Sequence, residues 1–276
     1  MASGQLMPAL ITFAFDPLLH LGDNTIRLET VALAAIILVG LLLLLVVARV
    51  TPVEGPYVPA PTLRFGDLPF LILGVVPGAV VGGRLDYVLV HLDFYAAHPE
   101  AVFDPTQGAL GLGLAVPGAI IGGTLIARLV DAPLDRWLHA SVMPMLFMLG
   151  AGKLAGVLSA TGQGALSTLP WATAYTGDGP WNSLAAYLPA QPSQVYEAIG
   201  CAAILVFLGL AIRAGAFSSR NGTALLIGLV LWAIIRGFLV LTWRDETVLG
   251  PLRAEQLVMI GVIVFAFVAM VRIRAR

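Results

Sequence analysis

Three basic residues lie inside apolar stretches of the chain, where a charge is costly. They are Arg84, Lys153 and Arg236, and each is adjacent to a glycine. A charged side chain within a hydrophobic span costs from about 3 to more than 10 kcal/mol unless a partner, a polar cavity or water relieves it. A guanidinium binds phosphate oxygens in pairs, and glycine allows a head group to approach closely. We therefore predict that the three residues bind an anion within the membrane.

Gly82 and Gly83 directly precede Arg84, and Asp86 follows two residues later. A simpler alternative is that Arg84 and Asp86 pair with each other and only stabilise helix packing. Residues two apart point to different faces of a helix, which favours the anion site over this alternative. The acids embedded with the three cations are Asp86 and Glu197, so positive charge is in excess and leaves room for an anionic ligand.

A polar segment opens an apolar run at residues 191–197. It places Gln194, Tyr196 and Glu197 in the first turns of the expected membrane helix. Pro192 suits a first turn, because its missing N–H costs nothing there, so the segment can also be read as a helix start alone. We predict that the three polar side chains shape the anion pocket.

The composition is that of an integral membrane protein. The 276 residues are 59% hydrophobic and 11% charged, with a mean hydropathy of +0.93, whereas a soluble domain is about 25% charged. The net charge of −1 gives no indication of a nucleic-acid partner. The chain has one cysteine, Cys201, and its four histidines show no metal-ligand spacing, so we expect neither a metal nor a cofactor.

Seven apolar runs are long enough to span a bilayer, which needs about 20 residues. We predict an all-α polytopic membrane protein in which 1–276 form a single domain. Residues 1–24 are expected to form a short re-entrant or surface segment, and 92–112 and 159–190 to form external loops. The predicted spans are residues 31–50, 68–91, 113–130, 138–158, 196–212, 223–243 and 257–271.

Basic residues are distributed unequally between the loops on the two sides. Nine lie in the loops and tail of one side, and three (Arg27, Arg244 and Arg253) lie on the other. The positive-inside rule therefore predicts an external N-terminus and a cytoplasmic C-terminus. The three cations within spans then lie nearer the outer leaflet, where an anionic phospholipid head group fits better than a cytoplasmic solute. No internal repeat is evident, which disfavours an anion transporter.

Five segments together resemble the prolipoprotein diacylglyceryl transferase family. Residues 81–89 (VGGRLDYVL) resemble its second-span motif, 150–154 (GAGKL) its G-A-G-R-L signature, 169–172 (LPWA) its F-P-W-A loop, and 191–197 (QPSQVYE) its H-P-S-Q-L-Y-E motif. Arg236 falls at the arginine of the family's sixth span. The resemblance runs in order from about residue 68 to the C-terminus, and seven spans with an external N-terminus are the family's topology.

The resemblance implies an activity, its partners and a cellular location. Such enzymes transfer the diacylglyceryl group of phosphatidylglycerol to the lipobox cysteine of a bacterial prelipoprotein in the inner membrane. A substrate thiolate displaces the phosphate ester, so the protein's own cysteine is not needed. By this resemblance Arg84 and Arg236 are the expected catalytic residues. The expected substrate-binding residues are Lys153, Gly82, Gly83, Gln194, Tyr196 and Glu197.

This sequence departs from the family's pattern at positions that handle protons or phosphate. The family's third-span histidine is replaced by a proline, which cannot accept or donate a proton. His91 or His98 is a possible substitute. The alternative is a relative that binds or handles phospholipid without transfer. The replaced positions are Pro117, Lys153, Gly156, Thr161 and Gln191.

Overall fold

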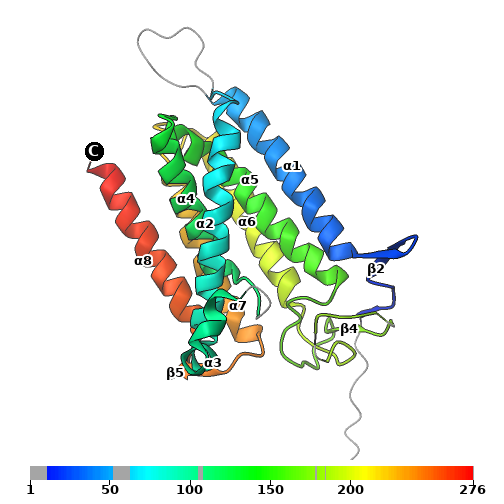
Figure 1. The fold of residues 1–276 in the computed structure, drawn as a ribbon. Coiled ribbons are helices and arrows are strands. Elements are labelled where there is room, and N and C mark those ends of the chain that lie inside the picture. The colour runs from blue at the N-terminus through cyan, green and yellow to red at the C-terminus, as the bar shows by residue number, and fades with distance from the viewer. Residues whose placement is uncertain (1–10, 52–62, 105–107, 178, 184, 276) are drawn as a thin grey trace, which may run out of the picture. The chain divides into compact units, whose positions relative to one another are not determined.

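The computed structural model describes residues 11–51, 63–104, 108–177, 179–183 and 185–275. The fold is mostly helical, and seven of the described helices are long and apolar enough to cross a membrane (Figure 1). The seven predicted spans are therefore confirmed, and the fold fits a polytopic membrane protein. These helices are α1 (Leu28–Val50), α2 (Asp67–Val90), α4 (Leu112–Leu129), α5 (Leu134–Ala155), α6 (Ser193–Arg213), α7 (Thr223–Leu239) and α8 (Ala254–Arg274).

Short elements lie between the long helices. The helical ones are α3 (Leu92–Ala97) and the 3-10 turns η1 (Pro99–Phe103), η2 (Gly156–Leu158) and η3 (Val240–Thr242). The sequence did not predict the short strands, which pair as β1 with β4, β2 with β3 and β5 with β6. They are β1 (Ile11–Phe13), β2 (Leu18–Leu21), β3 (Asn24–Arg27), β4 (Thr173–Tyr175), β5 (Thr247–Leu249) and β6 (Leu252–Arg253). Of the predicted N-terminal segment 1–24, residues 1–10 lie outside the described residues.

The chain divides into two compact units. The first unit comprises Met1–Leu43, Met143–Gly209 and Phe238–Asp245. The second unit comprises Leu44–Val142, Leu210–Gly237 and Glu246–Arg276. The single membrane domain expected from the sequence stays a prediction.

In the first unit, aromatic side chains hold the loop after α5 against the N-terminal strand. Strand β1 pairs in parallel with β4, with Ile11 opposite Thr173. Phe13 stacks on the buried Tyr175 with ring centroids 5.1 Å apart, and Trp181 packs on the same cluster. Burying large rings gives short strands a stability that two hydrogen-bonded strands lack on their own.

In the second unit, α2 and α4 pack closely because glycines line their contact. Gly74 and Gly78 of α2 lie against the backbones of Gly122 and Gly118 of α4, and an added Cβ at either α2 position would meet a carbonyl oxygen. Figure 1 shows the two helices side by side. Small residues at a membrane helix interface allow backbones to approach each other. The close approach fixes the register in which α2 presents its polar residues.

Candidate functional site

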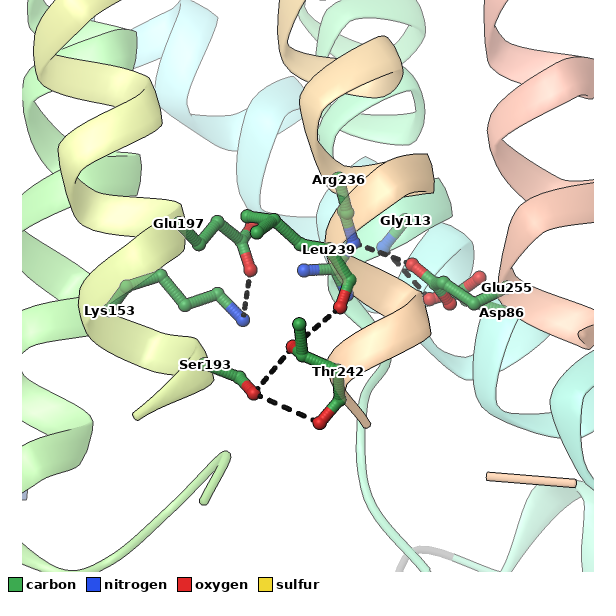
Figure 2. A network of polar contacts seen from close by, with 9 residues as sticks. All are labelled: Asp86, Gly113, Lys153, Ser193, Glu197, Arg236, Leu239, Thr242 and Glu255. Atoms are coloured by element: carbon green, nitrogen blue, oxygen red, sulfur yellow. Dashed lines mark hydrogen bonds and ion pairs between the residues drawn. The ribbon is translucent and has the colours of Figure 1, made fainter. Parts of the chain in front are cut away.

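Lys153 and Glu197 form an ion pair in the first unit. The Lys153 Nζ lies 3.1 Å from the Glu197 Oε2, and Figure 2 shows the two side chains directed toward each other. The Glu197 side chain is 2% exposed, whereas the Lys153 side chain is 24% exposed. The ammonium also lies over the Trp243 ring, 5.9 Å from its centroid. The pair therefore buries the acid and leaves part of the lysine accessible.

The other polar residues of the 191–197 segment contact the loop after α5. The Gln194 Nε2 donates to the Tyr175 hydroxyl at 3.3 Å, and the Trp171 Nε1 donates to the Tyr196 hydroxyl at 2.6 Å. The Gln194 Oε1 is buried with no hydrogen-bond partner among the described residues. Burial raises the pKa of the Tyr175 hydroxyl to about 12, although the hydrogen bond with Gln194 opposes the shift. Tyr175 is therefore neutral at physiological pH, and its hydroxyl accepts the hydrogen bond from Gln194.

A second set of contacts in the first unit fixes the start of α6 and the end of η3. The Ser193 Oγ is 2.7 Å from the Thr242 Oγ1, and Thr242 in turn donates to the Leu239 carbonyl at 2.7 Å (Figure 2). The Arg244 Nε donates to the Gly164 carbonyl at 2.7 Å. An added Cβ at Gly164 would meet Ser193 and Thr242, so glycine is required there.

In the second unit, Arg236 of α7 pairs with Glu255 of α8. The Arg236 Nε lies 2.6 Å from the Glu255 Oε1, and the side chains are 5% and 4% exposed. The guanidinium also lies over the Trp232 ring, 5.6 Å from its centroid. A charge pair this deeply buried must be well matched, because removing one partner strands the other charge in a low-dielectric interior.

Asp86 belongs to the same part of the second unit. Its Oδ2 accepts a hydrogen bond of 2.8 Å from the Gly113 N–H of α4, and its Oδ1 is buried without a hydrogen-bond partner among the described residues. A Cβ added at Gly113 would lie 2.8 Å from the Asp86 Oδ1 and 2.9 Å from the Glu255 Oε1. Both carboxyl groups therefore lie beside this glycine, and Arg236 pairs with one of them, Glu255 (Figure 2).

Arg84 contacts the backbone after α3. Its Nε donates to the Val102 carbonyl, and one guanidinium nitrogen donates to the carbonyls of Ala101 and Asp104 at 2.6 and 3.0 Å. It also lies over the Tyr95 ring, 5.3 Å from its centroid. These bonds satisfy the free carbonyls at the end of η1, so Arg84 has a structural role that the sequence did not indicate.

An apolar cavity of about 570 Å³ lies between α2, α4 and α8 in the second unit. It contains Pro117, the proline at the position of the expected histidine, and it reaches Gly82, Leu85 and Leu114. Gly83 is buried nearby, and its carbonyl accepts from the Gly111 N–H at 2.8 Å. A cavity with this lining accommodates hydrocarbon and offers no proton acceptor of its own at position 117.

Comparison with known proteins identifies the relatives of this chain. The sequence model for prolipoprotein diacylglyceryl transferase matches residues 18–272. The chain belongs to the prolipoprotein diacylglyceryl transferase family. It is 30% identical over 233 residues to the phosphatidylglycerol–prolipoprotein diacylglyceryl transferase of Nitrobacter hamburgensis, covering 82% of this chain and 76% of that protein. It is also 30% identical over 257 residues to the protein of that name from Trichormus variabilis, covering 90% and 86%.

Membership of this transferase family confirms the resemblance drawn from the motifs, and it makes the chain a member of an enzyme family. The match spans all five motif segments as well as Pro117. The roles assigned to single residues stay predictions. Among the described residues, no group of three or more His, Cys, Asp or Glu side chains could hold a metal ion.

The charge count made from the sequence is wrong in one respect. Glu255 is 4% exposed and pairs with Arg236, so the second unit buries an acid that the charge count left out. The sequence did not single it out, because an acid in the first turn of a helix is ordinary. Glu255 is 19 residues from Arg236 along the chain, and this separation matches no helical or strand period. Only the packing of α7 on α8 brings the two side chains together.

Proposed function

We propose that this protein transfers the diacylglyceryl group of phosphatidylglycerol to the lipobox cysteine thiol of bacterial prolipoproteins. The observation that carries the proposal is the family match over residues 18–272. It is supported by relatives that bear the name phosphatidylglycerol–prolipoprotein diacylglyceryl transferase and match most of the chain. The membrane lipid is thus one substrate and the lipobox peptide the other.

The proposed reaction needs positive charge at the phosphate that leaves. The substrate sulfur forms a bond to the glycerol carbon, the carbon–oxygen bond breaks, and glycerol phosphate departs with the electron pair. Arginine suits this task because it binds two phosphate oxygens at once. We assign phosphate binding and charge stabilisation to Arg84 and Arg236, and further phosphate binding to Lys153. Gly82, Gly83, Gln194, Tyr196 and Glu197 complete the proposed substrate-binding residues.

Single substitutions test this assignment. Changing Arg84, Lys153 or Arg236 to alanine should weaken retention of phosphatidylglycerol by about 1–3 kcal/mol, the scale of a charged hydrogen bond. Native mass spectrometry of the purified protein measures retention. Cys201→Ser is the control, because the nucleophile belongs to the substrate. Unchanged retention in all three basic variants would overturn the assignment.

We also propose that the chain is a single domain of the bacterial inner membrane, with an external N-terminus and a cytoplasmic C-terminus. The asymmetry of basic residues supports this orientation. Reporter fusions after residue 276 should read as cytoplasmic, and fusions within 159–190 as external. A cytoplasmic reading for 159–190 would contradict the orientation and the outer-leaflet site together.

Pro117 favours a second candidate function, in which the protein binds phospholipid without transferring it. Loss of general-base help costs about 10²–10⁴-fold in rate. Expression in cells depleted of their own transferase separates the two functions, because only an active enzyme restores lipoprotein modification. Replacing Pro117 by histidine and Lys153 by arginine together should raise the rate if proton transfer at position 117 is limiting.

A further inference from the structure

The proposed transfer requires a proton acceptor for the substrate thiol, and Pro117 cannot serve. The histidines that could substitute lie elsewhere. His91 and His98 are exposed, and the Nδ1 of each contacts the backbone carbonyl four residues earlier, at 2.9 and 3.1 Å. The thiol attacks the glycerol carbon beside the head-group phosphate, so its proton acceptor must lie close to the cationic residues assigned to that phosphate. The buried carboxyl groups near those residues are therefore the candidates.

Asp86 has the geometry of an available acceptor. It is 1% exposed, and its Oδ1 has no hydrogen-bond partner among the described residues, while the Gly113 N–H holds its Oδ2 in place at 2.8 Å. A buried oxygen without a partner is rare in native proteins and calls for an explanation. One such explanation is a catalytic role, in which the partner is supplied by the substrate.

The charges around Asp86 distinguish its role from that of Glu255. Arg236 directly neutralises Glu255, with an N–O distance of 2.6 Å. The same pair lies beside Asp86, since Gly113 is flanked by both carboxyl groups. Three groups therefore carry two potential negative charges and one positive charge. Uptake of one proton makes the net charge of the cluster zero. The oxygen that can take it is the Asp86 Oδ1, which has no hydrogen-bond partner among the described residues.

The residues that line the apolar cavity include chain neighbours of Asp86 and of Gly113. It is lined by Gly82 and Leu85 of α2 and by Leu114 of α4. Asp86 follows Gly82 by four residues and so lies on the same helix face, about 6 Å further along the axis. Gly113, which holds the carboxylate, directly precedes Leu114. If a lipid chain or an apolar peptide side chain fills the cavity, the polar part of the same molecule lies next to Asp86.

We infer that Asp86 is a catalytic residue that accepts the proton of the substrate thiol, a role that rests on the proposed transfer. The Asp86 Oδ1 takes the proton as the sulfur bonds to the glycerol carbon. The carbon–oxygen bond breaks, and its electron pair leaves with glycerol phosphate. The proton then passes from Asp86 to the departing phosphate, which restores the carboxylate. Atoms and charges balance without any further reactant.

The test measures transfer from phosphatidylglycerol to a fluorescent lipobox peptide by the purified full chain in lipid nanodiscs. Asp86→Asn keeps the size of the side chain and an oxygen for the Gly113 N–H, but it loses the carboxylate. We expect its rate to fall by about 10²–10⁴-fold, with unchanged phosphatidylglycerol retention. The matched control is Asp67→Asn. Asp67 is also buried on α2 and pairs with Arg64, and this variant should transfer at close to the wild-type rate.

A pH comparison separates proton transfer from a purely structural effect. A free thiol ionises near pH 8.5, so an assay at about pH 9 supplies the thiolate without a base. The deficit of Asp86→Asn should therefore shrink between about pH 7 and about pH 9. A defect in folding or lipid binding would persist at both values and overturn the inference. Asp86→Glu, which restores a carboxylate, should recover part of the rate.

The outcomes distinguish this inference from the proposed function. If the wild type transfers and Asp86→Asn transfers equally fast, Asp86 is not the acceptor, but the proposed function stands. If the wild type transfers nothing, the proposed function fails and this inference fails with it. Should Asp86→Asn not fold, judged by size-exclusion chromatography, Asp86→Ser provides the second variant, because it also lacks the carboxylate and keeps a polar group.

Discussion

Each of the two units pairs a basic residue with a buried acid, and the two arrangements differ in charge and exposure. In the first unit, one lysine faces one glutamate, and the lysine side chain is 24% exposed. In the second unit, one arginine faces Glu255 beside a further acid, Asp86, and all three residues are at most 4% exposed. The first arrangement is neutral and partly accessible. The second is enclosed and carries one more potential negative charge than positive charge.

The two ion pairs therefore differ in how far solvent can reach them. The phosphate binding that we propose for Lys153 would use this exposure, because an accessible ammonium can exchange its partner for a phosphate oxygen. An enclosed arginine is held by Glu255 and by the face of Trp232, so its main measurable effect on the free protein is stability. Breaking the second arrangement should therefore cost more than breaking the first, and the following experiments test that order.

The largest effect is expected for Arg236→Met. The change leaves two buried carboxyl groups without a cation and should destabilise the protein by about 3–5 kcal/mol. Thermal unfolding in detergent measures the loss. Arg213→Met is the control, because Arg213 is exposed in the last turn of α6. If Arg236→Met is as stable as the control, protons alone neutralise the carboxyl groups of Asp86 and Glu255.

A smaller loss is expected for Lys153→Met, about 1–3 kcal/mol, because Glu197 loses a partner that is itself partly solvated. Adding Glu197→Leu should restore most of that loss, since it removes the remaining charge. The same thermal unfolding assay applies to the single and double variants. A larger loss of stability in Lys153→Met than in Arg236→Met would contradict the expected order of the two units.

Gly113→Ala tests the close contact of the two carboxyl groups. The added methyl would meet the Asp86 and Glu255 oxygens, so we expect a loss of about 1–2 kcal/mol from overpacking. Gly261→Ala on α8 is the matched control, because nothing lies within 4 Å of its added Cβ and alanine favours helix. Equal stabilities of the two variants would place the carboxyl groups further from Gly113.

The smallest effect is expected for Tyr175→Phe in the first unit. It removes one buried hydrogen bond with Gln194 and keeps the ring that stacks on Phe13, so we expect a loss of about 0.5–1.5 kcal/mol. The free energy of unfolding should also show a different pH dependence. Because the pKa of Tyr175 is raised to about 12, its contribution is present below pH 10 and declines as the pH rises toward 12.

The sequence by itself determined the seven spans and the family. Runs of about 20 apolar residues can only be helices in a bilayer, because every backbone polar group must be satisfied within its own segment. The motifs around Arg84, Lys153 and Arg236 are local, so the order of residues along the chain was enough to find them. The sequence did not predict the ion pair between Lys153 and Glu197, although it indicated each of them as a site residue.

The tertiary structure alone decided the partners of those residues. Arg84 donates to carbonyls 17 to 20 residues away, and Glu255 meets Arg236 across the contact of α8 with α7. Such contacts depend on helix rotation and packing, which neither composition nor periodicity specifies. Asp86 shows the same limit: the sequence offered Arg84 as its partner, but the close approach of α2 and α4 gives it the Gly113 N–H instead, because a glycine there leaves room for a carboxylate.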